Sequence, residues 1–531
     1  MDWYRKFHNK RSIVFTDDDL ETVAERKERW RSIYVIYFTM FLMSLGFSIV
    51  VTGIYPYLDK LDNKAGKEFM GYVVAANPLA QMLFSPVIGW WGDKRGSIRV
   101  PLLVTLALFV FASGLYSILE ILPGDQKMFM FAARFLVGVS SANIAVARSY
   151  LSAATKFVER THAVSMVSLA QVLGFVVGPG LQAAVTPLGE NGFYVMNLPV
   201  NMYSMTGWIN VVMGVLNIVL FLPWNFKERR IALRDAMQNE GKATEEETLK
   251  SVKPDYVASW TLICAFFVLT FNFLLLEALG TPLTMEQFAW SKKEALYYMG
   301  LLMSIGGIVS SIVFCIISPL CKRFNERKVM MWGGFLFMLI GNIMFIPWGP
   351  DPPQIAYVDT SSNRTKDTNA TEMLGCPSTQ EWCSYTPQLT VTQFFIGFGF
   401  ITIGYPLGIT LIQTIFCKVL GPRPQGVWMG FMTGAGCASR GLGPVFITMI
   451  YTRLGTYYTF GTTGSMLILC MLWLQIVNKR LVPLQAIASK DEVNPDVEIP
   501  LVHRLSNNAQ ELNDVQKIEL QNVIKSNDNH I

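Results

Sequence analysis

About twelve apolar stretches, each long enough to cross a bilayer, constrain this chain more than any other feature of its sequence. A hydrocarbon core of ~30 Å requires roughly 20 apolar residues in a helix, and in lipid every backbone polar group must be paired internally. Charged residues make up only 16% of the chain, against the ~25% usual for soluble domains. The sequence therefore predicts an all-α membrane protein with twelve transmembrane helices.

The predicted spans form two groups of six, separated by a charged stretch. The first group is Ser32–Leu58, Phe69–Trp91, Pro101–Leu122, Phe129–Tyr150, Ala163–Val185 and Met202–Trp224. The second is Tyr256–Leu279, Ala295–Leu320, Val329–Ile346, Thr390–Cys417, Val427–Tyr451 and Thr459–Ile476. We expect a tail (residues 1–30), a six-helix bundle (31–224), a linker (225–254), a second bundle (255–478) with a long loop (347–389), and a disordered tail (479–531).

The distribution of lysine and arginine predicts the orientation. Short basic loops fall on one side of the predicted spans: Lys94–Arg99, Lys156–Arg160, Lys227–Arg230, Lys322–Lys328 and Lys479–Arg480. By the positive-inside rule this side, with both termini, is cytosolic. The long loop on the other side carries two glycosylation sequons, at Asn363 and Asn369, which must be lumenal to be used.

The cysteines agree with this orientation. Of the eight cysteines, Cys376 and Cys383 are the two in the long loop, where an oxidising lumen would allow a disulfide. The other six lie in or beside predicted helices and are expected to be packing residues. We predict no metal site and no cofactor.

The span Phe129–Tyr150 carries two arginines, Arg134 and Arg148. A continuous helix would place them roughly 21 Å apart on nearly one face, at about 1.5 Å and 100° per residue. A guanidinium stays charged, so that face should turn toward protein or a water-filled space. The alternative is that both are packing or end-anchor residues.

Two segments of the first bundle recur in the second at nearly the same separation. Arg134–Gly138 is echoed by Gln393–Gly397, and Gly174–Pro179 by Ser439–Pro444. Weak internal symmetry of this kind is typical of secondary transporters, whose substrate site lies between the repeats.

The segment Gly89–Gly96 resembles the signature of the major facilitator superfamily between its second and third helices. Arg134–Gly138 and Gly174–Pro179 are similar to that superfamily's motifs in helices four and five. This resemblance implies the major facilitator superfamily fold, two pseudo-symmetric six-helix bundles. Further segments resemble a lysosomal member of the superfamily: Trp30–Ser32, Tyr37–Gly46, Asn143–Tyr150, Thr281–Thr284, Gly375–Cys383 and Leu420–Tyr451.

That narrower resemblance implies a multi-pass protein of the lysosomal and late endosomal membrane that conducts small anions, with chloride or another halide as its partner. The residues favour the same reading. Arg134, Arg440 and Glu277 lie well inside predicted spans, with Arg148 near an end. A pathway with more cations than acids favours anions. From their depths along the helices we also predict that Arg134 and Glu277 pair across the bundles when the lumenal side is closed.

The signature loop supplies the expected gating residues Gly89, Asp93, Arg95 and Gly96, with Asp93 capping a neighbouring helix end, as the resemblance implies. The corresponding loop of the second bundle, Cys321–Lys328, lacks the aspartate and the glycine, which predicts unequal gating by the two halves. A further set of expected gating positions consists of Gly178, Pro179, Gly443 and Pro444. They predict either breaks that offer helix-terminal amides or structural kinks.

Two other functions stay open. One is a coupled carrier exporting a small organic solute, its site lined by Trp90, Tyr37, Tyr405, Gln413 and Asn77. The other is a non-transporting receptor or scaffold. An enzyme is not expected, because no catalytic set or phosphate loop occurs, and nucleic acid is not a partner because no basic run is interleaved with aromatics. Tyr4–Phe7 resembles a tyrosine-type signal for sorting adaptors.

Overall fold

The computed structural model describes residues 20–51, 53–62, 66–190, 192–195, 198–240, 254–349, 351–355, 357–358, 373–377 and 380–481. Within them, nine helices are long and apolar enough to cross a membrane. One of the nine contains two helices on either side of Gly455, one further span is the shorter helix Ser204–Leu220, and another is a helix interrupted by a π-helical turn. The described residues thus form twelve spans, and the predicted all-α membrane fold is confirmed.

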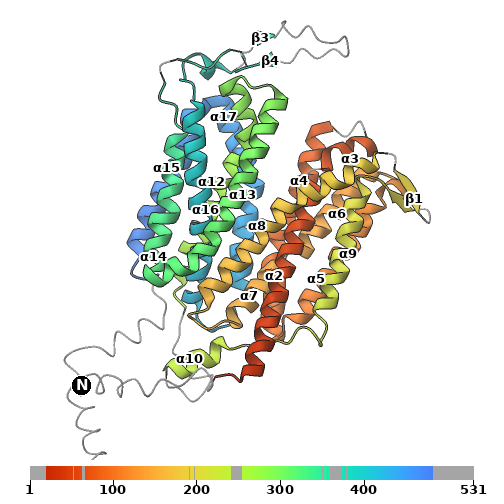
Figure 1. Ribbon diagram of the computed structural model, residues 1–531, viewed down its shortest axis with the longest axis vertical. Helices are drawn as coiled ribbons and strands as arrows, with labels where there is room; N and C mark the ends of the chain where they lie inside the picture. The colour runs from red at the N-terminus through yellow and green to blue at the C-terminus, as the bar shows by residue number, and fades with distance from the viewer. Residues whose placement is uncertain are drawn as a thin grey trace, which may run out of the picture. The chain divides into compact units, whose positions relative to one another are not determined.

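Figure 1 shows the first six spans as one bundle and the last six as another. The spans of the first bundle are α2 (Val23–Val51), α4 (Gly66–Arg95), α5 (Arg99–Ser117), α6 (Gln126–Ser141) continued by α7 (Asn143–Ala153), α8 (Arg160–Val185) and α9 (Ser204–Leu220). Those of the second are α12 (Tyr256–Phe288), α13 (Lys292–Arg323), α14 (Glu326–Val329) continued through a π-helical segment (Met330–Phe335) into α15 (Leu336–Met344), α16 (Val391–Leu420) and α17 (Gly426–Val477).

The remaining elements are short. They are the helices α3 (Ile54–Leu61) and α10 (Ala232–Glu240), the 3-10 helices Leu119–Ile121, Thr186–Leu188 and Glu381–Ser384, and the strands β1 (Phe193–Val195), β2 (Leu198–Val200), β3 (Tyr357–Val358) and β4 (Met373–Leu374). The strands form two antiparallel pairs, β1 with β2 and β3 with β4. Helix α10 lies in the segment that is predicted to be a linker between the two bundles (225–254).

Local capping explains where several spans of the second bundle begin. The Asp255 side chain accepts hydrogen bonds from backbone N–H groups of the first turn of α12. Ser291 with Glu294 and Thr390 with Gln393 form reciprocal capping boxes at the starts of α13 and α16. Each box satisfies two N–H groups that the helix leaves unpaired.

Helix α2 begins at Val23, inside the segment expected to be a tail. Thr22 Oγ1 accepts a 3.2 Å hydrogen bond from the backbone N–H of Glu25, and the Glu25 carboxylate accepts one from the N–H of Thr22. This capping box starts the helix among charged residues, before the apolar stretch begins.

The fourth span is broken at Ala142, where a single helix was predicted. The hydroxyls of Ser140 and Ser141 both donate to the backbone carbonyl of Val137, at 2.6 and 2.9 Å. Hydroxyls that bond back to a carbonyl of the preceding turn bend helices. Here the interruption lies at Ala142, between α6 and α7.

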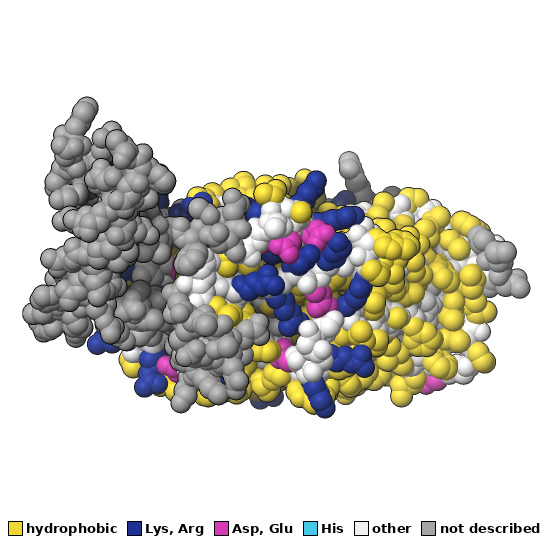
Figure 2. Space-filling model, turned by 90° about the horizontal axis from the view of Figure 1, so that it is seen from below, with side chains coloured by type: hydrophobic (Ala, Val, Ile, Leu, Met, Phe, Trp, Pro, Cys, Tyr) yellow, Lys and Arg dark blue, Asp and Glu magenta, His cyan; other side chains and the backbone are white. Residues whose placement is uncertain are grey.

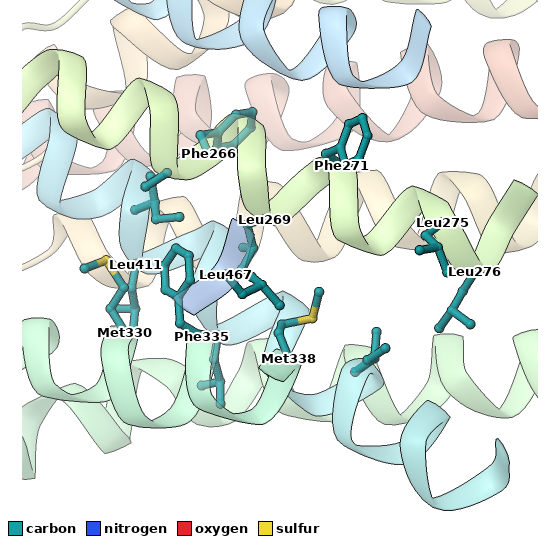
Figure 3. Close-up of a cluster of buried hydrophobic side chains, with 14 of the residues drawn as sticks. Phe266, Leu269, Phe271, Leu275, Leu276, Met330, Phe335, Met338, Leu411 and Leu467 are labelled. Carbon is teal, nitrogen blue, oxygen red and sulfur yellow. The ribbon is translucent and has the colours of Figure 1, made fainter. Parts of the chain in front are cut away.

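Each bundle has its own apolar core. In the second bundle, Leu269 of α12 lies on the side of Phe335 and Met338 of the ninth span (Figure 3), whereas Phe266 of α12 packs against Gly436 of α17. Leu269 and Phe335 are both 0% exposed. Burying side chains of this size stabilises each bundle by roughly 1.5–3 kcal/mol per residue in aqueous terms.

A disulfide joins Cys376 to Cys383, and the loop that it closes anchors α17. Trp382 of this loop is fully buried and packs edge-on against Tyr451, with ring centroids 5.3 Å apart. Gly455, where α17 turns from the eleventh span into the twelfth, lies beneath the indole at φ +82°. Only a residue without a side chain fits this close approach.

Replacing Gly455 with alanine should therefore prevent proper folding of the last two spans. The new Cβ would lie 2.6 Å from the Trp382 ring in a backbone conformation that disfavours any side chain. Gly461 on the same helix has open space around it, so Gly461→Ala is the matched control. Fluorescence-detected size exclusion and thermal unfolding should show loss of the folded peak for Gly455→Ala alone. A folded peak for both variants would contradict this role of Gly455.

The ends of the spans differ in charge. Lys and Arg side chains gather over one end, whereas hydrophobic side chains cover the neighbouring flank (Figure 2). We call this the basic end; Arg95, Arg160, Arg323 and Lys418 lie there. The opposite end, the loop end, carries α3, the two strand pairs and the disulfide loop.

Candidate functional site

Arg148 lies on α7 in the first bundle and turns toward α8. Its Nη2 donates a 2.9 Å hydrogen bond to Gln171 Oε1. Its Nε is buried and has no hydrogen-bond partner among the described residues. Arg148 is therefore held in place by Gln171 and keeps hydrogen-bonding capacity for another group.

Arg440 and Glu277 belong to the second bundle, on α17 and α12. Both side chains are exposed although both lie inside membrane-spanning helices. The Arg440 guanidinium carbon lies 5.9 Å from the ring centroid of Phe175 on α8, so Arg440 points toward the first bundle. Its charge acts both on the Glu277 carboxylate and on Arg148. Their exposure is therefore to the space between the bundles.

Tyr405 of α16 completes this group. Its phenol experiences the charges of Arg440, Glu277 and Arg148, and its ring stacks on Phe273 with centroids 3.9 Å apart. We call Arg148, Gln171, Glu277, Tyr405 and Arg440 the central cluster. Sequence reasoning identified the three charged residues and Tyr405 but not Gln171, whose only signal is a polar side chain in an apolar span.

Arg134 lies apart from the central cluster. It is 2% exposed, and its guanidinium lies 5.5 Å from the Phe47 ring centroid, within the first bundle. The predicted pair with Glu277 does not form in this structure, where the charge acting on Glu277 is that of Arg440. That prediction concerned a conformation closed on the lumenal side, whereas in this structure the bundles are joined by hydrogen bonds at the basic end.

Asp93 joins the two bundles at the basic end. Its carboxylate accepts hydrogen bonds from the backbone N–H groups of Gly426 and Val427, at 2.9 and 3.0 Å. These groups belong to the first turn of α17, so Asp93 caps that helix as expected. A carboxylate at a helix N-terminus gains from both the hydrogen bonds and the helix dipole. Gly89, one turn earlier, lets the backbones touch, since a Cβ there would lie 2.1 Å from the Gly426 carbonyl oxygen.

Two other residues of the signature loop, Arg95 and Gly96, lie where α4 ends. Gly96 ends α4 at φ +64°, the left-handed conformation common after helix C-termini. Arg95 is exposed at the same end, where the structure gives it no contact that would support a gating role.

The loop of the second bundle makes a related contact, although it lacks the aspartate. Glu326 accepts hydrogen bonds from Thr161 Oγ1, at 2.5 Å, and from Lys418 Nζ, at 2.7 Å. Thr161 lies in the first turn of α8, in the other bundle. Arg160 adds a 3.2 Å hydrogen bond to the carbonyl of Cys417. Sequence reasoning missed this contact because Glu326 is displaced from the aspartate position of the signature.

The glycine–proline sites do not break their helices. Pro179 lies inside α8 and Pro444 inside α17, so of the two alternatives the one with helix-terminal amides is wrong. Gly178 serves close packing instead, since a Cβ there would lie 2.6 Å from Ser48 of α2. Gly443 makes only ordinary contact, with Phe271 at 3.7 Å.

Four predictions concern residues that the structure does not describe. They are the sequons at Asn363 and Asn369, the sorting motif Tyr4–Phe7 and the disordered tail, whose residues 482–531 lie outside the described part of the chain.

Comparison with known proteins agrees with this architecture. A family model described as Major Facilitator Superfamily matches residues 36–361. Over 482 residues the chain is 39% identical to "Major facilitator superfamily domain-containing protein 8" of Xenopus laevis, covering 87% of this chain and 94% of that protein. The motif resemblance is thereby confirmed.

Solved structures show the same fold at low identity. The proton:xylose symporter XylE has a TM-score of 0.62 at 13% identity, covering 85% of this chain and 96% of its own. The human organic anion transporter MFSD10 (TETRAN) has a TM-score of 0.57 at 15% identity, covering 84% of this chain and 99% of its own. From the family model, the relative and the fold together, this chain belongs to the major facilitator superfamily.

Proposed function

We propose that this chain carries small inorganic anions, chloride among them, across the lysosomal membrane through the space around the central cluster. The observation that carries the proposal is the approach of Arg148 and Arg440 from opposite bundles. Their like charges act on each other, with Glu277 as the acid that interacts with Arg440.

Two guanidiniums and one carboxylate leave the central cluster with an excess positive charge. Arginine does not lose its proton in proteins, so this excess is permanent. An anion between the bundles would relieve the repulsion between Arg148 and Arg440, whereas a cation would add to it. Sites lined in this way lower the barrier for anions and raise it for cations.

The proposal is tested by purifying the full chain and reconstituting it in liposomes. We expect an electrical potential to drive chloride and bromide flux, and potassium flux to stay at the level of protein-free vesicles. Potassium flux equal to chloride flux, or no anion flux in correctly folded protein, would refute it. Patch-clamp of enlarged lysosomes carrying the chain then tests whether it conducts in the lysosomal membrane and which ion it conducts.

The bundles are joined at the basic end, which favours a second candidate, an alternating carrier of a small organic solute. Side-chain hydrogen bonds cross between the bundles at this end; they involve Asp93, Arg160, Thr161, Glu326 and Lys418. A carrier needs such a closed end in one of its states. Saturable, stoichiometric flux without single-channel steps would favour this candidate, while current with such steps would favour the anion channel.

Asp93→Asn should open the basic end more often. The substitution removes a charge from two hydrogen bonds to a helix N-terminus, a loss of about 1–2 kcal/mol, so the open population should rise about tenfold. Cys417 is 3% exposed at the same end, where its carbonyl accepts hydrogen bonds from Arg160 and from Gln425, the residue before α17. It serves as a reporter when the other free cysteines are replaced.

We expect an impermeant maleimide applied from the basic end to label Cys417 faster in Asp93→Asn than in the parent. Asp59→Asn, which changes an exposed carboxylate on α3, is the matched control. Equal labelling rates in all three proteins would mean that Asp93 caps α17 without controlling access.

A further inference from the structure

Arg134 is a buried cation with an incomplete set of partners. Its Nε and Nη2 are buried and make no hydrogen bond within the described part of the chain. The structure also gives it no ion pair with a described acid, and the group whose charge acts on it is the phenol of Tyr116. A buried arginine without an acid is costly to keep, because its unpaired donors point into a medium that solvates the charge poorly.

The surroundings of Arg134 offer little compensation. The neighbouring Ala133 and, one turn away, Met130 are fully buried members of an apolar cluster. The Phe47 ring provides a cation–π contact at 5.5 Å, which lowers the cost of the charge but does not neutralise it.

A second unpartnered donor lies close by. Tyr57 of α3 is fully buried, and its hydroxyl has no hydrogen-bond partner among the described residues. Its ring packs edge-on against Tyr116 at 5.3 Å and is stacked on Tyr203 at 5.1 Å. The cluster therefore combines a guanidinium with phenol groups; the acid whose charge acts on Tyr57 is Glu120, which is paired with Lys60 at 2.9 Å. This is the chemistry that binds an anion.

We propose that a small monovalent anion of the halide class binds inside the first bundle, between Arg134 and the Tyr116–Tyr57 pair. The 2% exposure of Arg134 leaves no access for a bulky anion, which separates this site from the central cluster. The bound anion completes the charge balance of the first bundle and stabilises its fold. The site is independent of the transport proposal, because its residues lie within one bundle.

The test is thermal unfolding of the purified full chain in detergent, with chloride replacing gluconate at constant ionic strength. We expect a saturable rise of the melting temperature with chloride and with bromide. A ligand that binds only the folded state stabilises it in this concentration-dependent way. Absence of any chloride dependence would overturn the proposal.

Variants locate the site. Arg134→Gln should fold in gluconate, because it removes an unpaired charge, and should lose the chloride dependence. Tyr116→Phe preserves the packing and should raise the half-saturating chloride concentration several-fold; it decides the matter if Arg134→Gln does not fold. Arg440→Gln should keep the full chloride-dependent shift even where anion flux is lost. If instead Arg440→Gln abolishes the shift while Arg134→Gln or Tyr116→Phe leaves it unchanged, the stabilising anion sits in the central cluster and the proposal fails.

Discussion

With Arg440 replaced by glutamate, chloride flux through the reconstituted chain should fall at least about tenfold. The change converts the excess positive charge of the central cluster into an excess negative one. Two unit charges ~6 Å apart interact by roughly 3 kcal/mol at an effective dielectric of about 20. Arg440 is exposed, so solvent screening reduces this figure, and tenfold is the conservative expectation.

Arg453→Glu is the matched control, because Arg453 is an exposed arginine on the same helix, α17, nearer the loop end. It makes the same change of total charge without touching the central cluster. Flux that falls equally in both variants would show that surface charge, and not the cluster, sets the rate.

The interaction of Arg440 with Glu277 allows a sharper version of this experiment. Glu277→Gln removes the acid and should increase the preference for chloride over potassium. Exchanging the two residues, Arg440→Glu with Glu277→Arg, preserves the net charge of the cluster and should restore much of the flux lost in Arg440→Glu. No recovery would show that the position of the arginine matters as well as its charge.

Hydropathy and charge bias predicted the spans and the charged members of the central cluster because both depend on composition along one helix. An apolar run of the right length must be a helix in lipid, and an arginine within it must face protein or water. Asp93 was also predictable, since a signature loop places a carboxylate where a neighbouring helix begins. These features require no knowledge of how two helices face each other.

The Arg134–Glu277 pair illustrates what the sequence could not provide. Residue counting gives the depth of a side chain in the membrane but not the direction in which it points. The direction of Arg134 depends on Gly138, whose missing Cβ allows contact with the Asn77 carbonyl of α4. Arg148, in contrast, turns toward α8, where it donates a hydrogen bond to Gln171.

Arg29 is a further residue that sequence reasoning overlooked, because the charged segment before the first apolar run was taken as a tail. In the structure it is 0% exposed. Its Nε and Nη2 donate to the two carboxylate oxygens of Glu21 at 2.9 and 2.7 Å, and Nη1 donates to Glu159 at 2.8 Å and to the Ala154 carbonyl at 2.9 Å. Arg29 thus ties the start of α2 to the loop before α8.

Arg29→Ala should destabilise the first bundle by about 3–5 kcal/mol, since it leaves two carboxylates without their shared cation. The melting temperature of the purified chain should fall by at least about 5 °C. Arg31→Ala removes an exposed arginine with a single side-chain hydrogen bond, to Asn225, and should change stability by no more than about 0.5 kcal/mol.

Neutralising all three partners, Arg29→Leu with Glu21→Gln and Glu159→Gln, should recover much of the loss, because the penalty in Arg29→Ala comes from the uncompensated acids. If the triple variant melts as low as Arg29→Ala, the anchoring contacts of the guanidinium, and not the charge balance, hold α2 in place.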